Sequence, residues 1–322
     1  MINIIIPCYK CENTLPLTLN SLVAQTNKKF IITLIQDGPE TNIEEIVNNY
    51  KDKLNINFIK LKENVGPGLA RQEGINKNIL CEYLLFLDSD DMLLPYAIEI
   101  LNRESQLNKP DILISQFINH NLYGITKIMD ISKANTWLHG KLYRAEFLLN
   151  NNICFSSKIK YNEDACFNLK ALNSTNNIKV IELPTLLWID CKNSITRSDN
   201  NFEINSIPDF IIGQIEATLF LLDKNNCSVR LLAKNINNIY NQYQKYIFYT
   251  NRKEENVEKE LKEFLTRAQI KEILNNKIFK KLLLYYNHKE KNEKFTCEEE
   301  TIFCFIRRFV PEFKIEKQEV II

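Results

Sequence analysis

Residues 84–91 read LLFLDSDD, so four apolar residues run directly into a segment with three carboxylates. An apolar run of this length is typical of a buried β-strand, and its acidic end must lie where the strand leaves the core. Three anions this close together repel one another, so we expect a positive group to stabilise them. The stretch therefore predicts a strand that carries polar chemistry at its carboxyl end.

The sequence around this stretch alternates short apolar strands with amphipathic helices, in units of roughly 25–30 residues. Strands are expected at residues 2–6, 30–35, 56–61, 83–87 and 111–117, with two more around Pro184 within 178–189. Helices are expected at 12–25, 42–51, 69–78 and 93–107, and a further helix start within 135–150. This alternation needs crossover connections, so it predicts an α/β fold with a mostly parallel sheet flanked by helices.

Polar loops follow four of these strands, at residues 7–12, 36–40, 64–71 and 88–91. In parallel α/β sheets, ligands bind beyond the carboxyl ends of the strands. We therefore expect the four loops to converge on one rim and to build a composite site there.

The pattern changes after about residue 205, where long amphipathic helices are expected at 206–224, 228–250 and 254–287. The polar run at 198–201 separates the two patterns, so we place an α/β domain at 1–200 and a helical accessory domain at 201–322. Basic residues at 277, 280, 281, 307 and 308 and tyrosines at 240, 243, 246 and 249 fit a solvated helix surface. The alternative is a docking surface for an acceptor.

Composition narrows the class of protein. The 322 residues are 45% hydrophobic and 25% charged, as in a globular protein with a buried core, and a net charge of +1 gives no global attraction for nucleic acid. No window approaches the ~18 continuous apolar residues of a membrane helix, and the opening MINIIIP indicates a strand rather than a leader. Nine scattered cysteines suit a reducing compartment. We therefore expect a cytoplasmic protein without a transmembrane segment.

Cys8 and Cys11 form the one CxxC in the chain. No second CxxC or pair of histidines follows at the spacing of a zinc site, and no redox-type βαβ context precedes it. We therefore favour a loop that carries two thiols over a metal or redox motif.

The acidic end of the 83–87 strand carries Asp88, Ser89 and Asp90 in the pattern Asp-x-Asp. Two carboxylates at the end of a rigid strand offer hard oxygen ligands, which suit Mg²⁺ or Mn²⁺ and leave ligand positions for a diphosphate. The cation would also supply the positive charge that these acids require. The alternative is that Asp90 and Asp91 cap a helix that begins directly after them.

Five motifs occur in order along the first part of the chain. They are IIPCY at 5–9, LVAQT at 22–26, QDG at 36–38, NVGPGLAR at 64–71 and LDSDD at 87–91. Their order and spacing resemble those of the family 2 glycosyltransferases of GT-A fold, and the likeness continues through WLHGKLYR at 137–144 and NED at 162–164. The resemblance covers about residues 1–200 and implies a Rossmann-like GT-A sheet, which an α-helical C-terminal domain follows here.

The resemblance implies an inverting hexosyltransferase that takes sugar from a nucleotide diphosphate, usually UDP, and uses Mn²⁺ or Mg²⁺. Its acceptor would be a hydroxyl, on a glycan for example. The donor-binding residues implied are Pro7, Tyr9, Asp37, Asn64, Gly66, Arg71, Asp88, Ser89, Asp90 and Lys141.

Several of these residues have particular implied roles. Pro7 and Tyr9 would shape the nucleotide pocket, and Arg71 would line the base and ribose. Asp37 would accept a hydrogen bond from the base N3–H, which uracil and thymine offer and cytosine does not.

The acids after the 83–87 strand would hold the ribose and the cation. Asp88 would hold the ribose hydroxyls, and Asp90, with Asp88, would bind the metal on the diphosphate, with Asp91 a weaker candidate. Lys141 would neutralise phosphate or have no role in the site.

Glu163 and Asp164 match the acidic pair whose aspartate serves as catalytic base. Direct displacement at the anomeric carbon requires the attacking hydroxyl to lose its proton, which a carboxylate opposite the leaving diphosphate can accept. We assign Asp164 as base, with Glu163 orienting it or touching the acceptor. The alternative, which is compatible with the first, is that both acids complement the dipole of a helix that follows.

Trp137 and His139 are weaker acceptor-side candidates: Trp137 could stack on a sugar or lie in the core, and His139 could act as a second base. Residues 194–197 resemble a serine-containing loop near the donor. The chain departs from the family pattern at Gln36, where a second acid is usual, and at Lys10, where asparagine is usual.

Three other functions remain open from the sequence. A glycosyltransferase acting on modified DNA bases would need a basic face on the helical domain and a steep salt dependence. A nucleotidyltransferase would need a glycine- and lysine-rich loop after the first strand, where this chain has PCYKCEN. A non-catalytic nucleotide-sugar-binding protein would not need all of Asp88, Asp90 and Asp164.

Overall fold

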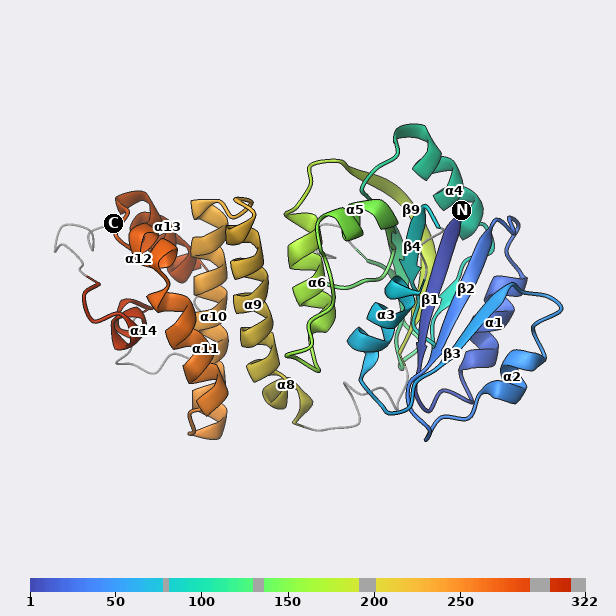
Figure 1. Ribbon diagram of the computed structural model, residues 1–322, viewed down its shortest axis with the longest axis horizontal. Helices are drawn as coiled ribbons and strands as arrows, with labels where there is room; N and C mark the ends of the chain where they lie inside the picture. Colours follow the sequence, from blue (N-terminus) through green and yellow to red (C-terminus); the bar gives the residue numbers. More distant parts are fainter. Residues whose placement is uncertain (78–80, 130–135, 191–200, 290–301, 314–322) are drawn as a thin grey trace. The chain divides into compact units, whose positions relative to one another are not determined.

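The computed structural model describes residues 1–77, 81–129, 136–190, 201–289 and 302–313. The chain divides into two compact units, Met1–Ser198 and Asp199–Ile322 (Figure 1). The first is an α/β unit and the second is helical.

The first unit alternates strands and helices. Its elements are β1 (Ile2–Cys8), α1 (Leu15–Val23), β2 (Phe30–Gln36), α2 (Glu44–Asn48), β3 (Ile56–Lys60), α3 (Pro67–Asn76), β4 (Tyr83–Phe86), β5 (Met92–Leu93), α4 (Ala97–Asn108), β6 (Ile112–His120), β7 (Thr126–Ile128), β8 (Lys141–Arg144), α5 (Ala145–Asn150), α6 (Glu163–Leu172) and β9 (Ile178–Ile189).

The described strands form one mixed sheet in the order β3-β2-β1-β4-β8-β6-β9-β5, with β7 paired to β6. β3, β2, β1 and β4 are parallel, as the strand–helix alternation predicts. β8 is antiparallel to both β4 and β6, and β9 runs parallel to β6. Four parallel strands therefore end at one edge of the sheet, and that edge carries their loops.

The β1 strand lies at the centre of the parallel half and is buried along its whole length. Its even-numbered isoleucines pack in one apolar cluster with Leu15, Leu19 and Leu22 of α1. On the other face, a Cβ added to Gly74 of α3 would lie 2.6 Å from Cγ2 of Ile5, so this glycine lets α3 lie directly on the sheet. The two helices thus cover opposite faces of β1 (Figure 1).

Three short strands, β5, β7 and β8, were not predicted from the sequence. The helix expected at 93–107 begins only at Ala97, because Met92 and Leu93 form β5 and pair with β9. The alternative that Asp90 and Asp91 cap a helix is therefore wrong, since a strand follows them. The helix start expected within 135–150 is likewise preceded by β8 and begins at Ala145.

The two strands expected around Pro184 are a single strand, β9, which accommodates the proline through an irregularity. The register between β6 and β9 shifts on both sides of Gln116, the residue paired with Pro184. A proline cannot donate a hydrogen bond to the sheet, and a local bulge accommodates this.

The second unit is built from amphipathic helices. They are α8 (Phe202–Asn205), α9 (Ile207–Asp223), α10 (Val229–Thr250), α11 (Glu255–Thr266), α12 (Ala268–Leu274), α13 (Lys277–Lys289) and α14 (Ile302–Phe309). The single helix expected at 254–287 is three helices, because Arg267 adopts an extended conformation between α11 and α12, and Asn275 ends α12.

The tyrosines and basic residues singled out in this unit lie in different environments. Tyr240 and Tyr243 are buried, whereas Tyr249 is half exposed. Lys280 is buried over the Phe313 ring, while Lys277 and Lys281 are exposed. Within the described part of the chain, no helix is both long enough and apolar enough to cross a membrane.

Candidate active site

Asp37 holds together two of the loops at the carboxyl edge of the parallel strands. It follows β2, and its carboxylate accepts hydrogen bonds from the backbone N–H groups of Val65 (2.8 Å) and Gly66 (3.0 Å) in the loop after β3. Gly66 has a φ of +86°, which glycine adopts without strain. Burial raises the pKa of Asp37, although these two hydrogen bonds oppose the shift. The structure thus gives Asp37 a role in shaping the loop, and its contact with a base stays a prediction.

The other predicted residues of the nucleotide pocket lie on the same edge. Pro7 is buried in β1, whereas Tyr9, just beyond the strand, is 39% exposed. Lys10 has a φ of +49° and places Nζ 5.0 Å from the centre of the Tyr9 ring, while its backbone N–H donates to Thr41. Asn64 is exposed in the loop after β3. Cys8 and Cys11, in the same region, are free and buried.

Asp88 leaves the end of β4 and meets the guanidinium of Arg71, with 2.6 Å between Arg71 Nη2 and Asp88 Oδ1. The Asp88 side chain is 39% exposed, whereas that of Arg71 is 6% exposed. Burial opposes ionisation of Asp88, but the charges of Arg71 and then His139 outweigh it and lower its pKa. Arg71 is therefore a positive group that the acidic end of β4 requires.

His139 is the second positive partner of this acidic turn. Its Nε2 lies 3.2 Å from Oδ2 of Asp91 and 3.9 Å from Oδ2 of Asp88. The other oxygen of the buried Asp91 carboxylate accepts from the backbone N–H of Ile189 (3.1 Å). Burial disfavours the charged imidazole, yet the hydrogen bond and charge of Asp91, with Asp88, raise the pKa of His139.

Aromatic rings fix the His139 ring in place. The Phe117 ring centre lies 5.4 Å and the Trp188 ring centre 5.1 Å from it, both tilted by about 30°. Trp137, half-buried, packs against the same two rings at 5.9 and 5.8 Å. Trp188 was not predicted as a site residue. It lies in β9, whose buried and exposed residues follow no regular alternation, so no sequence pattern marked it. Trp137 belongs to this aromatic group, and its contact with an acceptor stays a prediction.

The side chains of Asp88, Asp91 and His139 could hold a divalent cation. One ligand atom from each lies within 4.8 Å of the others. Two carboxylates and an imidazole are suitable ligands for Mn²⁺, so the residues fit such an ion. Asp90, which the sequence favoured over Asp91, is half-buried in the same turn and is not in this group of three.

Glu163 and Asp164 form the first turn of α6, as the dipole interpretation requires. Arg71 Nη1 donates to Glu163 Oε1 at 2.9 Å, so one guanidinium joins the acidic turn after β4 to this helix. Burial, and then the charge of Glu163, raises the pKa of Asp164 to about 7, while Arg71 opposes the shift. Asp164 Oδ1 accepts from the backbone N–H of Ala165 at 2.7 Å.

Lys141 begins β8 beside the carboxyl end of β4, at the edge of the sheet that carries the site, but its side chain is buried. Only 1% of the residue is exposed, and Nζ donates to the backbone carbonyl of Trp137. Burial lowers its pKa to about 8, while the charge of Asp164 acts in the opposite direction. The contact of Lys141 with a phosphate stays a prediction. The loop at residues 194–197 lies outside the described residues.

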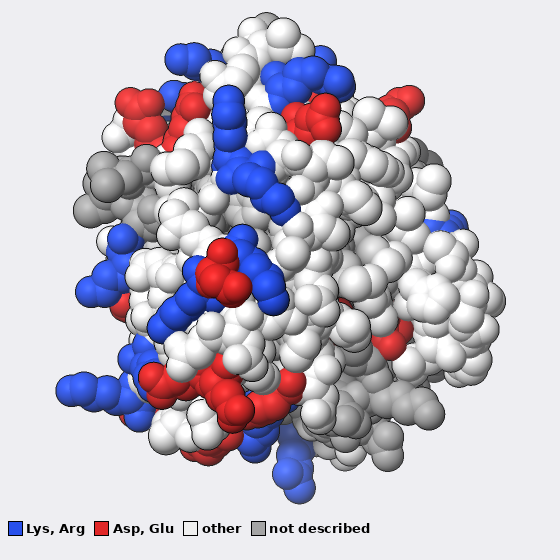
Figure 2. Space-filling model, turned by 90° about the vertical axis from the view of Figure 1, so that its right-hand side faces the viewer, with Lys and Arg blue, Asp and Glu red and all other residues white. Residues whose placement is uncertain are grey.

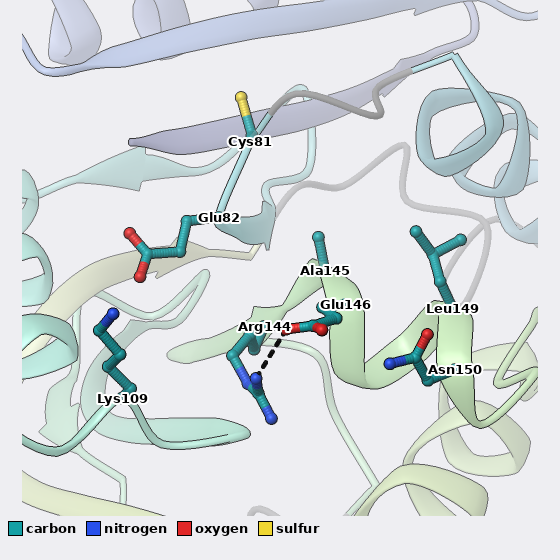
Figure 3. A pocket seen from close by; sticks show the side chains of 8 residues that line it. All are labelled: Cys81, Glu82, Lys109, Arg144, Ala145, Glu146, Leu149 and Asn150. Carbon is teal, nitrogen blue, oxygen red and sulfur yellow. Dashed lines mark hydrogen bonds and ion pairs between the residues drawn. The ribbon is translucent and has the colours of Figure 1, made fainter.

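A hollow of about 370 Å³ lies at the opposite edge of the sheet (Figure 3). Cys81 and Glu82 line it at the amino end of β4, with Lys109, Arg144 and Glu146 around them. In its lining, Arg144 Nη1 donates a hydrogen bond to Glu146 Oε2 at 3.0 Å. The chain from Cys81 to Asp88 runs seven residue steps, which span roughly 20 Å when extended, so this hollow is separate from the acidic site.

The sequence is similar to known glycosyltransferases. Residues 3–159 match the family described as Glycosyl transferase family 2. The Staphylococcus aureus (strain MW2) poly(ribitol-phosphate) beta-N-acetylglucosaminyltransferase TarS is 28% identical over 193 residues, which are 56% of this chain and 34% of TarS. A Bacillus spizizenii poly(ribitol-phosphate) beta-glucosyltransferase is 31% identical over 195 residues, 56% of this chain and 30% of the relative. The matches thus span about a third of these relatives.

Solved structures show the same fold. A crystal structure of S. aureus TarS residues 1–349 with UDP superposes with a TM-score of 0.65 at 22% identity, covering 90% of this chain and 87% of that one. The corresponding complex with UDP-GlcNAc gives a TM-score of 0.66 at 20% identity, covering 91% and 89%. The first unit is thus a GT-A glycosyltransferase fold. Residues 3–159 of this unit belong to glycosyltransferase family 2.

Proposed function

We propose that this chain is a metal-dependent, inverting glycosyltransferase that moves a sugar from a UDP-linked donor to an acceptor hydroxyl. The observation that carries the proposal is the joining of two acidic groups, Asp88 and Glu163–Asp164, by the single buried guanidinium of Arg71. One group suits a cation and a diphosphate, and the other suits a proton acceptor. Transfer with inversion requires both functions at one site.

Asp164 acts as the base in this proposal. A general base works best when its pKa lies near the working pH, and burial raises the pKa of Asp164 to about 7. The carboxylate accepts the proton of the acceptor hydroxyl as the hydroxyl oxygen attacks the anomeric carbon and the bond from that carbon to the diphosphate breaks. Glu163, bonded to Arg71, keeps the start of α6 in place.

Asp88, Asp91 and His139 would hold the divalent ion, with Asp90 beside them in the turn. When bound, such an ion supplies positive charge to the leaving diphosphate. Asp88 stays ionised because Arg71 lowers its pKa, so it can bind a cation or ribose hydroxyls, while His139 would bind the ion in its neutral form. Asp37 fixes the loop at the base end of the site.

The acceptor is, in our proposal, a hydroxyl of a glycan or polyol-phosphate polymer. Two relatives are poly(ribitol-phosphate) glycosyltransferases, which supports this class of acceptor. Transfer to DNA bases has less support, because the net charge is +1. On the face in Figure 2, where the α/β unit lies in front, the described acidic and basic side chains are interspersed. A steep salt dependence of DNA binding would favour that alternative.

Thermal stability and product formation together test the proposal. Purified protein is heated with UDP, UDP-GlcNAc or UDP-glucose, each with Mn²⁺ or with EDTA, and UDP release is then measured with and without poly(ribitol phosphate). A ligand at 100 times its dissociation constant adds about 2.7 kcal/mol of stability, which shifts the Tm visibly. We expect a Mn²⁺-dependent shift with UDP compounds. The absence of any shift would contradict the donor site, and a shift without turnover would indicate a binding protein.

A further inference from the structure

We propose that Arg71 is a positioning residue that sets the distance between the donor-side turn and the catalytic helix, rather than a residue that lines the base and ribose. This inference rests on the proposed function for its kinetic consequences. The geometry itself is independent of that function, because the guanidinium bonds two carboxylates that lie far apart in sequence.

The guanidinium of Arg71 bridges Asp88 and Glu163 with separate nitrogens. Nη2 bonds to Asp88 Oδ1 at 2.6 Å and Nη1 to Glu163 Oε1 at 2.9 Å. Only 6% of the Arg71 side chain is exposed, and Glu163 is also almost enclosed at 12%. A planar guanidinium fork holds two acceptors in fixed directions, which a lysine ammonium does not.

The packing around the bridge leaves Glu163 little freedom. A Cβ added to Gly68, one turn before Arg71 on α3, would lie 2.7 Å from Cγ of Glu163. The Arg71 guanidinium carbon also lies 5.9 Å from the centre of the Phe155 ring, which stacks on Phe167 of α6 at 4.3 Å. Glu163, the first residue of α6, is therefore packed against α3, and the chemically active neighbour, Asp164, follows it directly.

The charges at the bridge also favour a structural link over a ligand contact. Burial alone would lower the pKa of Arg71, but Asp88 and Glu163 raise it, so the guanidinium remains charged. Its two Nη atoms are already engaged by carboxylates from two elements. A misplacement of about 1 Å between reacting groups can reduce a rate ~10²-fold, so a loosened bridge should reduce turnover more than donor affinity.

The test uses Arg71→Lys, Glu163→Gln and the double variant. The matched control is Arg103→Lys, Glu104→Gln and their double variant, a pair with a 3.0 Å contact in which the arginine is 61% exposed. For each, kcat and KM are measured with UDP-GlcNAc and Mn²⁺, and the Kd for UDP is measured separately. We expect each single change at the bridge to lower kcat about 10²-fold, with the Kd for UDP within about threefold and the double variant no worse than either single.

Two results would overturn the inference. A rise in the Kd for UDP with kcat unchanged would make Arg71 a nucleotide ligand, and losses that multiply in the double variant would mean that the two residues act separately. Gly68→Ala provides a second route, because it displaces Glu163 and leaves Arg71 intact. We expect it to lower kcat without changing the Kd for UDP.

The same variants separate this inference from the proposed function. If wild-type protein releases no UDP from any donor, the proposed function fails, and the bridge is then judged from Tm alone. If the Tm changes are non-additive in the Arg71–Glu163 cycle and additive in the Arg103–Glu104 cycle, they support the bridge between Asp88 and Glu163. Additive changes in both cycles would overturn it.

Discussion

Asp88 and Asp164 are both aspartates, and the charge of Arg71 acts to lower the pKa of each, yet their pKa values shift in opposite directions. At Asp88, direct contact with Arg71 outweighs burial and lowers the pKa. At Asp164, burial and the neighbouring Glu163 outweigh the more distant Arg71 and raise the pKa to about 7. The difference shows how one charged residue can keep one acid ionised while leaving another able to take a proton.

The largest expected effect comes from Asp164→Asn. The amide keeps the size of the side chain but cannot accept the acceptor proton, so we expect sugar transfer to fall by ~10²–10⁴-fold. Binding of UDP with Mn²⁺ should remain within a few-fold of wild type, measured by calorimetry. The control is Asp52→Asn, which changes an exposed acid. Loss of UDP binding in Asp164→Asn would contradict the distinction between Asp88, on the donor side, and Asp164, as the proton acceptor.

A smaller effect is expected on the Asp88 side of the comparison. If His139 holds the cation with Asp88 and Asp91, then His139→Ala should weaken Mn²⁺-dependent UDP binding by about 10–100-fold. His120→Ala, at an exposed histidine bonded to Thr126, serves as control. A titration of Tm against Mn²⁺ measures the change. If Mn²⁺ dependence is unaltered in His139→Ala but lost in Asp90→Asn, the cation binds the Asp-x-Asp pair predicted from the sequence instead.

The smallest expected effect is on stability. The folded-state pKa of Asp164, about 7, exceeds its usual 3.8, so the folded protein binds this proton more tightly than the unfolded chain. This contribution is present at low pH and is lost as pH rises through 7. Asp164→Asn removes the cost of the buried charge, so at pH 8 we expect its Tm to exceed that of wild type by about 2–4 °C. A lower Tm at pH 8 would contradict this account.

The parallel half of the fold could be predicted because each strand is a continuous apolar run and each helix has a regular period. The loops after β1, β2, β3 and β4 then had to share an edge. The short strands could not be predicted in this way: β5 has two residues and β7 three, too few to show a period. Their pairing depends on partners far along the chain.

The acidic motifs of the site were visible in the sequence, but their partners were not. Arg71 and Glu163 are 92 positions apart, and His139 and Asp91 are 48 apart. No local pattern specifies such contacts, because they arise only when α3, α6 and the segment before β8 pack at the end of β4. For the same reason the burial of Lys141 could not be predicted, because it follows from the position of β8 between β4 and β6.

The pH dependence of kcat is the most direct test of the claim that Asp164, with a raised pKa, is the proton acceptor. Transfer is measured from pH 5 to 9 at saturating UDP-GlcNAc, Mn²⁺ and poly(ribitol phosphate), or with the donor and acceptor that the first assays select. We predict that kcat rises about tenfold per pH unit at low pH and levels off above an inflection near 7. A rate that stays constant down to pH 5 would contradict the account, because the base would then be an acid of ordinary pKa.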